Sequence, residues 1–83
     1  MTDKHKTRVR FVYLYGEILA VFLGKDAMRR FTGYGYVRQC YAHVGQHGAC
    51  YDRAYRLKRV PPALYLPLVR EMESLGYNLD IRQ

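Results

Sequence analysis

The segment from Cys40 to Cys50 holds the densest group of chemically versatile side chains in this 83-residue sequence. It reads Cys-Tyr-Ala-His-Val-Gly-Gln-His-Gly-Ala-Cys, and it contains both cysteines of the chain and two of its three histidines. Polar and ring-bearing residues stand here between glycines, where a hydrophobic core would favour branched aliphatic side chains. Such a segment suits metal binding, catalysis by histidine or recognition of a ligand.

Metal binding is suggested by the spacing of four side chains, Cys40, His43, His47 and Cys50. Thiolate and imidazole are ligands that zinc prefers, and a bound metal stabilises a small domain. In an extended strand, however, Cys40 and His43 point to opposite faces, so a shared ion requires a turn between them. We therefore expect no cofactor and keep a zinc-stabilised domain as an alternative.

Catalysis is suggested by the two histidines, because imidazole ionises near neutral pH and serves as a general base. His43 or His47 could act in metal-free RNA cleavage, with a neighbouring histidine, tyrosine or arginine completing the site. No carboxylate lies near them in the sequence to orient an imidazole. The sequence therefore favours a protein that is not an enzyme, with a ribonuclease as an alternative.

Recognition is suggested by charge, since fourteen Lys and Arg residues against seven Asp and Glu give a net charge of +7. A basic surface favours nucleic acid or an acidic protein surface as partner. We expect a small basic binding module whose binding residues are Tyr41, His43, Gln46, His47, Arg38, Arg53 and Arg56. A structural role is also compatible with this pattern, with His43 bonded to backbone carbonyls and Gln46 holding its loop.

The elements that position these residues begin with two β-rich segments. Thr7 to Tyr15 and Glu17 to Leu23 predict a hairpin closed at Tyr15-Gly16, and Tyr36 to Val44 predicts a third strand. Residues 24 to 35 predict a loop with one helical turn at Asp26 to Arg30, and residues 46 to 48 predict a second loop. Both hairpin strands are apolar on both faces near the turn, and a second protomer could cover the face that no helix covers.

One helix is predicted from Pro62 to about Leu75, preceded by a short helical turn near Tyr51 to Tyr55. Its apolar stripe is Tyr65, Leu68, Val69, Met72 and Leu75, with Pro67 as the misfit. Gly76 ends the helix and Tyr77 to Arg82 alternates as a last strand. The order β-β-β-α-β predicts an α+β fold, a small antiparallel sheet with the C-terminal helix on one face.

The length and composition predict a single domain over residues 1–83, with residues 1–6 as a disordered leader. Nothing at the N-terminus resembles a signal peptide, and no segment is long enough to cross a membrane, so we expect a cytoplasmic protein with reduced cysteines. A homodimer is one way for so short a chain to gain stability.

Several of these segments together resemble a family of short bacterial, phage and mobile-element proteins with no assigned biochemical activity. The resemblance rests on Gly16-Glu17 and the apolar residues after it, on Tyr41-x-His43-x-Gly45-Gln46-His47, and on Glu71 and Gly76-Tyr77. It covers most of the chain and implies the layout of a sheet, a helix and a closing strand. The chain departs from the family's pattern in residues 24–36, at Pro67 and at both cysteines.

Overall fold

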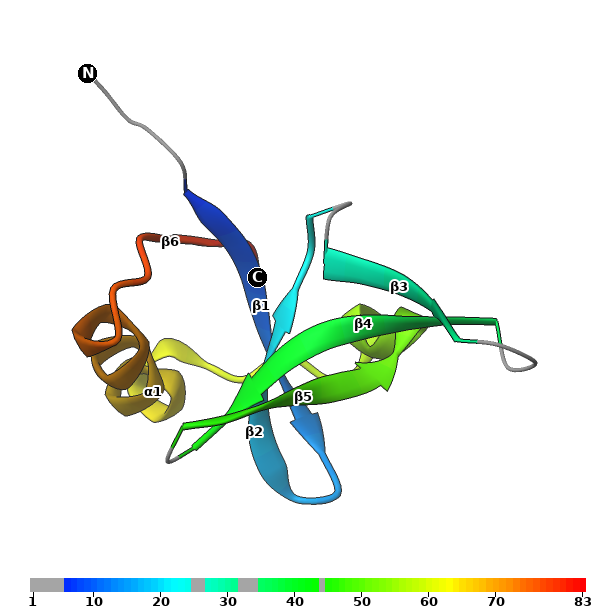
Figure 1. Cartoon of the computed structure of the whole chain (residues 1–83). Coiled ribbons are helices and arrows are strands. Elements are labelled where there is room, and N and C mark those ends of the chain that lie inside the picture. Colours follow the sequence, from blue (N-terminus) through cyan, green and yellow to red (C-terminus); the bar gives the residue numbers. More distant parts are fainter. Residues whose placement is uncertain (1–5, 25–26, 32–34, 44) are drawn as a thin grey trace.

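The computed structural model of the chain describes residues 6–24, 27–31, 35–43 and 45–83 (Figure 1). Its elements follow the order β1 (Thr7–Leu14), β2 (Glu17–Phe22), β3 (Met28–Phe31), β4 (Gly35–Ala42), β5 (Gln46–Tyr51), the 3-10 helix η2 (Asp52–Arg56), α1 (Pro62–Ser74) and β6 (Leu79–Ile81). The predicted α+β fold is confirmed. Five strands rather than three precede the helix, and most of the leader predicted for residues 1–6 lies outside the described residues.

The six strands form one mixed sheet in the order β3-β4-β2-β1-β6, with β5 on β4. All neighbours are antiparallel except β1 and β6, which run parallel. The predicted all-antiparallel sheet is wrong at this last strand, because the chain crosses from β5 through η2 and α1 before it returns beside β1.

The two predicted loops contain the additional strands. Residues 28–31 were expected to lie in a loop with a helical turn at Asp26 to Arg30, but they pair with β4 as β3, and Asp26 lies outside the described residues. Residues 46–48 belong to β5, which pairs with β4 so that Tyr41 lies opposite His47 and Cys40 opposite Gly48. Both segments have poor strand composition, and their pairing with β4 overrides that local preference.

The β1–β2 hairpin is confirmed, including its turn. Leu14 pairs with Glu17, and Tyr15 and Gly16 both have positive φ angles, 51° and 79°. Two successive positive φ angles define the type I′ turn, whose twist matches that of the strands it joins.

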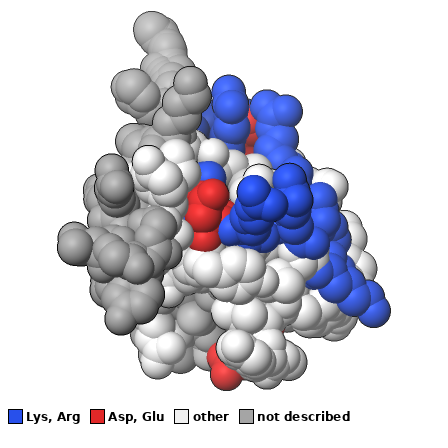
Figure 2. Space-filling model, turned by 90° about the vertical axis from the view of Figure 1, so that its right-hand side faces the viewer, with Lys and Arg blue, Asp and Glu red and all other residues white. Residues whose placement is uncertain are grey.

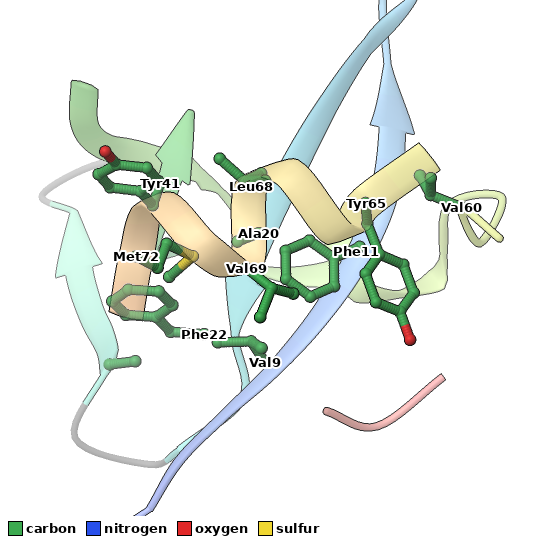
Figure 3. Close-up of a cluster of buried hydrophobic side chains, with 11 residues drawn as sticks. Val9, Phe11, Ala20, Phe22, Tyr41, Val60, Tyr65, Leu68, Val69 and Met72 are labelled. Carbon is green, nitrogen blue, oxygen red and sulfur yellow. The ribbon is translucent and has the colours of Figure 1, made fainter. Parts of the chain in front are cut away.

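Helix α1 packs on one face of β1, β2 and β4 over a first core (Figure 3). The buried residues of this core, among those that the structure describes, are Val9, Phe11, Ala20, Phe22, Ala27, Tyr41, Val60, Tyr65, Leu68, Val69 and Met72. Four members of the predicted stripe are buried, whereas Leu75 is 53% exposed, because the helix ends at Ser74. Gly76, with φ of 103°, and the bond from the Tyr77 N–H to the Met72 carbonyl end the helix as predicted.

A second core lies on the opposite face of the same strands. It contains Val12, Leu19, Val21, Cys40, Cys50 and Ala54, the last from η2. Residues of β5 and η2 of the same chain pack on the second apolar face of the hairpin, and a second protomer there stays a prediction. The helical turn predicted near Tyr51 to Tyr55 is confirmed as η2.

The segment between η2 and α1 lies along β1. The Tyr13 N–H donates to the Lys58 carbonyl over 2.9 Å, and the Val60 N–H donates to the Phe11 carbonyl over 3.0 Å. These bonds fix both the basic residues around Lys58 and the start of α1. No helix in the described part of the chain has the length and apolar character needed to span a membrane.

Candidate functional site

Tyr41 connects the β4–β5 hairpin to the first core. Its side chain is fully buried, and its ring meets that of His47 on β5 at a centroid distance of 4.7 Å in an edge-on arrangement. Figure 3 shows its hydroxyl at the border of the core, beside the end of α1 that holds Met72. Tyr41 is therefore a core residue whose polar end reaches the surface of the site.

Glu71, the residue before Met72 on α1, receives three donors from the described residues of this hairpin. Its carboxylate accepts hydrogen bonds from the Tyr41 hydroxyl, from the Gly45 N–H over 3.2 Å and from Nδ1 of His43 over 2.7 Å. The Gly45 N–H also donates to the Tyr41 hydroxyl over 2.8 Å. Glu71 thus fixes the β4–β5 turn against the helix, and it supplies the orienting carboxylate that lies far from both histidines in the sequence.

The ring of His43 is held by Glu71 through Nδ1, and most of the rest of the side chain is open to water. Its side chain is 80% exposed while that of Glu71 is 22% exposed. With the Nδ1 proton directed at a carboxylate, the neutral ring carries its lone pair on Nε2. Among the described residues, none forms a hydrogen bond with Nε2, so this oriented nitrogen is left to face solvent.

His47 is fixed from the other side of Tyr41. Its Nε2 lies 2.7 Å from the hydroxyl of Tyr77, whose ring packs edge-on against Phe22. A small hollow of about 80 Å³ adjoins this pair and is lined by Phe22, Gln39, Cys40, His47, Gly48 and Tyr77. Both predicted histidines therefore lie on the α1 side of the sheet, each with an oriented ring.

Burial, followed by the hydrogen bond with Glu71, raises the pKa of Tyr41 above the ordinary value of tyrosine. Its hydroxyl consequently stays protonated and remains a donor to the carboxylate.

The alternative zinc set is divided between the two faces of the sheet. Cys40 and Cys50 lie in the second core, and the Cys50 thiol donates to the Arg38 carbonyl, whereas His43 and His47 lie on the face that meets α1. The hydrogen bond that the Cys50 thiol donates to Cys40, together with burial, raises the pKa of the Cys50 thiol. Within the described ranges, no three His, Cys, Asp or Glu side chains come close enough to hold a metal ion.

Arg38 was expected to contact a ligand, but the structure places it inside the protein. The residue is 8% exposed, and its guanidinium donates to the carbonyls of Phe22 and Gly24 and to Oδ1 of Asp52 over 3.0 Å. All of these partners belong to the protein itself. Arg38 therefore ties β2 and η2 to β4.

A separate group of cations lies around η2 and along β1. We call Arg10, Arg53, Arg56 and Arg59 the basic face. Arg10 donates to the Tyr55 carbonyl over 3.2 Å, and the guanidinium of Arg56 lies 5.8 Å from the centre of the Tyr55 ring. Figure 2 views the molecule from the right-hand side of Figure 1. It shows Lys and Arg side chains gathered on one part of that surface.

Two of these cations, Arg10 and Arg59, are close enough to repel each other. Partial burial, followed by the charge of Arg59, lowers the pKa of Arg10 below the ordinary value of arginine. Among the described acidic groups, Asp52 forms its salt bridge with Arg38 and Asp80 with Arg82. An anionic ligand would relieve the repulsion on the basic face.

The predicted binding residues therefore fall into four groups. Tyr41, His43 and His47 cluster around Glu71 and Tyr77, while Gln46 is exposed at the start of β5. Arg53 and Arg56 belong to the basic face, on the side of the sheet that carries the second core, and Arg38 is internal. In Figure 1, α1 and the yellow-green segment containing η2 lie toward opposite ends of the sheet.

Residue-by-residue reasoning missed Glu71 and Tyr77, although both belong to the motif that carries the family resemblance. Their types and their distance from the histidines in sequence give no local signal of contact. Searches of protein-family models, curated proteins and solved structures find no match to this chain.

Proposed function

We propose that the chain is a nucleic-acid-binding module that contacts the phosphate backbone with its basic face. The observation that carries the proposal is the group of cations around η2 and β1, in which Arg10 and Arg59 repel each other. Phosphates lie at short intervals along a nucleic acid, so one chain can neutralise several neighbouring cations and release the counterions condensed on it.

The alternative partner is an acidic protein surface, which the same cations attract. The arrangement favours nucleic acid because the Tyr55 ring lies among the cations, beside Arg56. Aromatic rings next to a cationic path are typical of surfaces that hold nucleic-acid strands. The experiment below separates the two partners.

Binding to fluorescent RNA and DNA oligonucleotides is measured at a series of salt concentrations. We expect the affinity to fall steeply with salt, and replacing Arg53 and Arg56 together with alanine should lower the slope of log affinity against log salt by about 2. Arg70→Ala is the matched control, because Arg70 is exposed on α1, away from the basic face. Failure to bind any oligonucleotide at low salt, with capture of an acidic protein instead, would contradict the proposal.

A further inference from the structure

We propose that the Glu71–His43 pair, together with His47, forms a site that cleaves single-stranded RNA without a metal. This inference rests on the proposed binding of nucleic acid and adds a reaction at a second site, on the α1 side of the sheet. We call Tyr41, His43, His47, Glu71 and Tyr77 the histidine cluster.

The base in this reaction is His43. Glu71 holds Nδ1 at 2.7 Å, and Glu71 is itself held by the Tyr41 hydroxyl and the Gly45 N–H. A base whose second nitrogen is fixed by a carboxylate keeps one tautomer and one orientation, as in other histidine-based active sites. Most of the His43 ring is exposed, so Nε2 is accessible to a substrate that does not enter a deep pocket.

The acid is His47, which lies on the same side of the sheet. The hydroxyl of Tyr77 holds its Nε2, and Tyr41 lies between it and the Glu71 carboxylate. In the protonated ring, Nδ1 is a second donor that no other described group engages. Two imidazoles fixed around one tyrosine can therefore divide the roles of base and acid.

The open surface of the histidine cluster indicates a polymer rather than a small molecule. The hollow beside His47 holds only about 80 Å³, well below the volume of an ordinary small-molecule site. RNA carries its own nucleophile, the ribose 2′-hydroxyl, so its cleavage requires proton transfer but no bound metal or cofactor. Single-stranded RNA is favoured because its flexible backbone can align that hydroxyl with the scissile bond.

In the reaction, Nε2 of His43 takes the proton of the 2′-hydroxyl, and O2′ bonds to the adjacent phosphorus. The bond from phosphorus to O5′ breaks, and the departing oxygen takes a proton from Nδ1 of His47. The products are a 2′,3′-cyclic phosphate and a 5′-hydroxyl end. His43 then releases its proton to water and His47 regains one, which restores both groups.

The test is cleavage of a single-stranded RNA oligonucleotide in the presence of a chelator, with the DNA of the same sequence and an RNA with one 2′-deoxy position as controls. We expect cleavage of the RNA alone, with a cyclic phosphate end identified by mass spectrometry and a bell-shaped pH dependence. His43→Ala should lower the rate by about 10²- to 10⁴-fold. His43→Gln, which can still donate to Glu71, should lose the rate while keeping the melting temperature.

Glu71 is a positioning residue, so Glu71→Gln should lower the maximal rate more than it changes the substrate concentration for half-maximal rate, and it should shift the pH profile. Wild-type protein that binds RNA but leaves it intact would overturn this inference and leave the proposed function standing. Cleavage that persists equally in His43→Gln protein purified in parallel would also overturn it. Absence of both binding and cleavage would overturn both proposals.

Discussion

Arg38 gives the sharpest test of whether a cation near the candidate site is structural or binds a ligand. Sequence reasoning placed it with Arg53 and Arg56 in one binding surface, whereas the structure encloses it between β2, β4 and η2. Replacing Arg38 with alanine removes the salt bridge to Asp52 and the bonds to the carbonyls of Phe22 and Gly24. The expected result is loss of stability rather than loss of a ligand contact.

The magnitude follows from these contacts. Breaking a fully buried ion pair by removing one partner costs about 3–5 kcal/mol. The Asp52 side chain is 30% exposed, and water can solvate part of its charge after the substitution, which lowers the cost. The loss of the two hydrogen bonds from the charged guanidinium to the carbonyls of Phe22 and Gly24 raises the cost again. We expect the free energy of unfolding to fall by about 2–4 kcal/mol, a large share of the roughly 4–12 kcal/mol typical of a chain this long.

The assay is urea unfolding followed by circular dichroism, with thermal unfolding as a second probe. The melting temperature should fall by roughly 10–25 °C, because each kcal/mol lowers it by about 4–8 °C in a small domain. Arg53→Ala is the control: the residue is exposed on η2, and its loss should change stability by less than about 0.5 kcal/mol while weakening nucleic-acid binding. An Arg38→Ala protein with wild-type stability and the binding defect of Arg53→Ala would refute the internal role of Arg38.

Three further predictions address the hairpin turn and the histidine cluster. Tyr15→Asn should raise the free energy of unfolding by about 0.5–1 kcal/mol in urea titrations, because Tyr15 is 96% exposed with a positive φ that asparagine tolerates better; a loss of stability would contradict this account of the turn. The raised pKa of Tyr41 favours the neutral ring in the folded state, so this contribution to stability is complete below about pH 10 and is lost as the pH rises through the raised pKa. Tyr41→Phe should therefore show a shallower alkaline decline in unfolding free energy, and an unchanged decline would argue against the shift. Glu71→Ala should cost about 1–3 kcal/mol and speed hydrogen exchange at the Gly45 amide, whereas Glu73→Ala, on an exposed residue of the same helix, should do neither.

The sequence predicts the first hairpin and α1 well because local rules and burial agree there. Tyr15-Gly16 supplies the backbone angles of a type I′ turn, and the apolar residues of α1 recur at helical spacing between Pro62 and Gly76. Each signal is contained within the element it describes. No contact with the rest of the chain is needed to recognise it.

Strands β3 and β5 could not be predicted in the same way. Met28–Phe31 has two arginines at its centre, and Gln46–Tyr51 contains a histidine and a glycine, so neither shows the alternation of a half-buried strand. Both are fixed by pairing with β4. Their conformation depends on contacts between segments rather than on their own residues.

Half of the candidate site was predictable from the sequence. Residue type and spacing identified the histidines, but the contact of Glu71 with His43 joins residues 28 positions apart on a helix and a turn. Helical periodicity places Glu71 beside the apolar stripe without indicating which strand end it meets. The burial of Arg38 was equally hidden, because an arginine in an alternating strand normally indicates a solvent-exposed position.

The parallel pairing of β1 with β6 has a consequence for the rate at which the protein folds. Arg10 bonds to the Arg82 carbonyl, and the Phe11 backbone bonds to the Gln83 side chain, in each case across 72 positions. Closing such long loops is slow, and a high mean separation of contacting residues lowers folding rates. The β1–β2 hairpin can form within microseconds. The edge of β1 away from β2, however, keeps unpaired backbone N–H and C=O groups until residues 58–83 have been synthesised. During synthesis on the ribosome, β1 therefore remains open to strand pairing with other chains until those residues emerge.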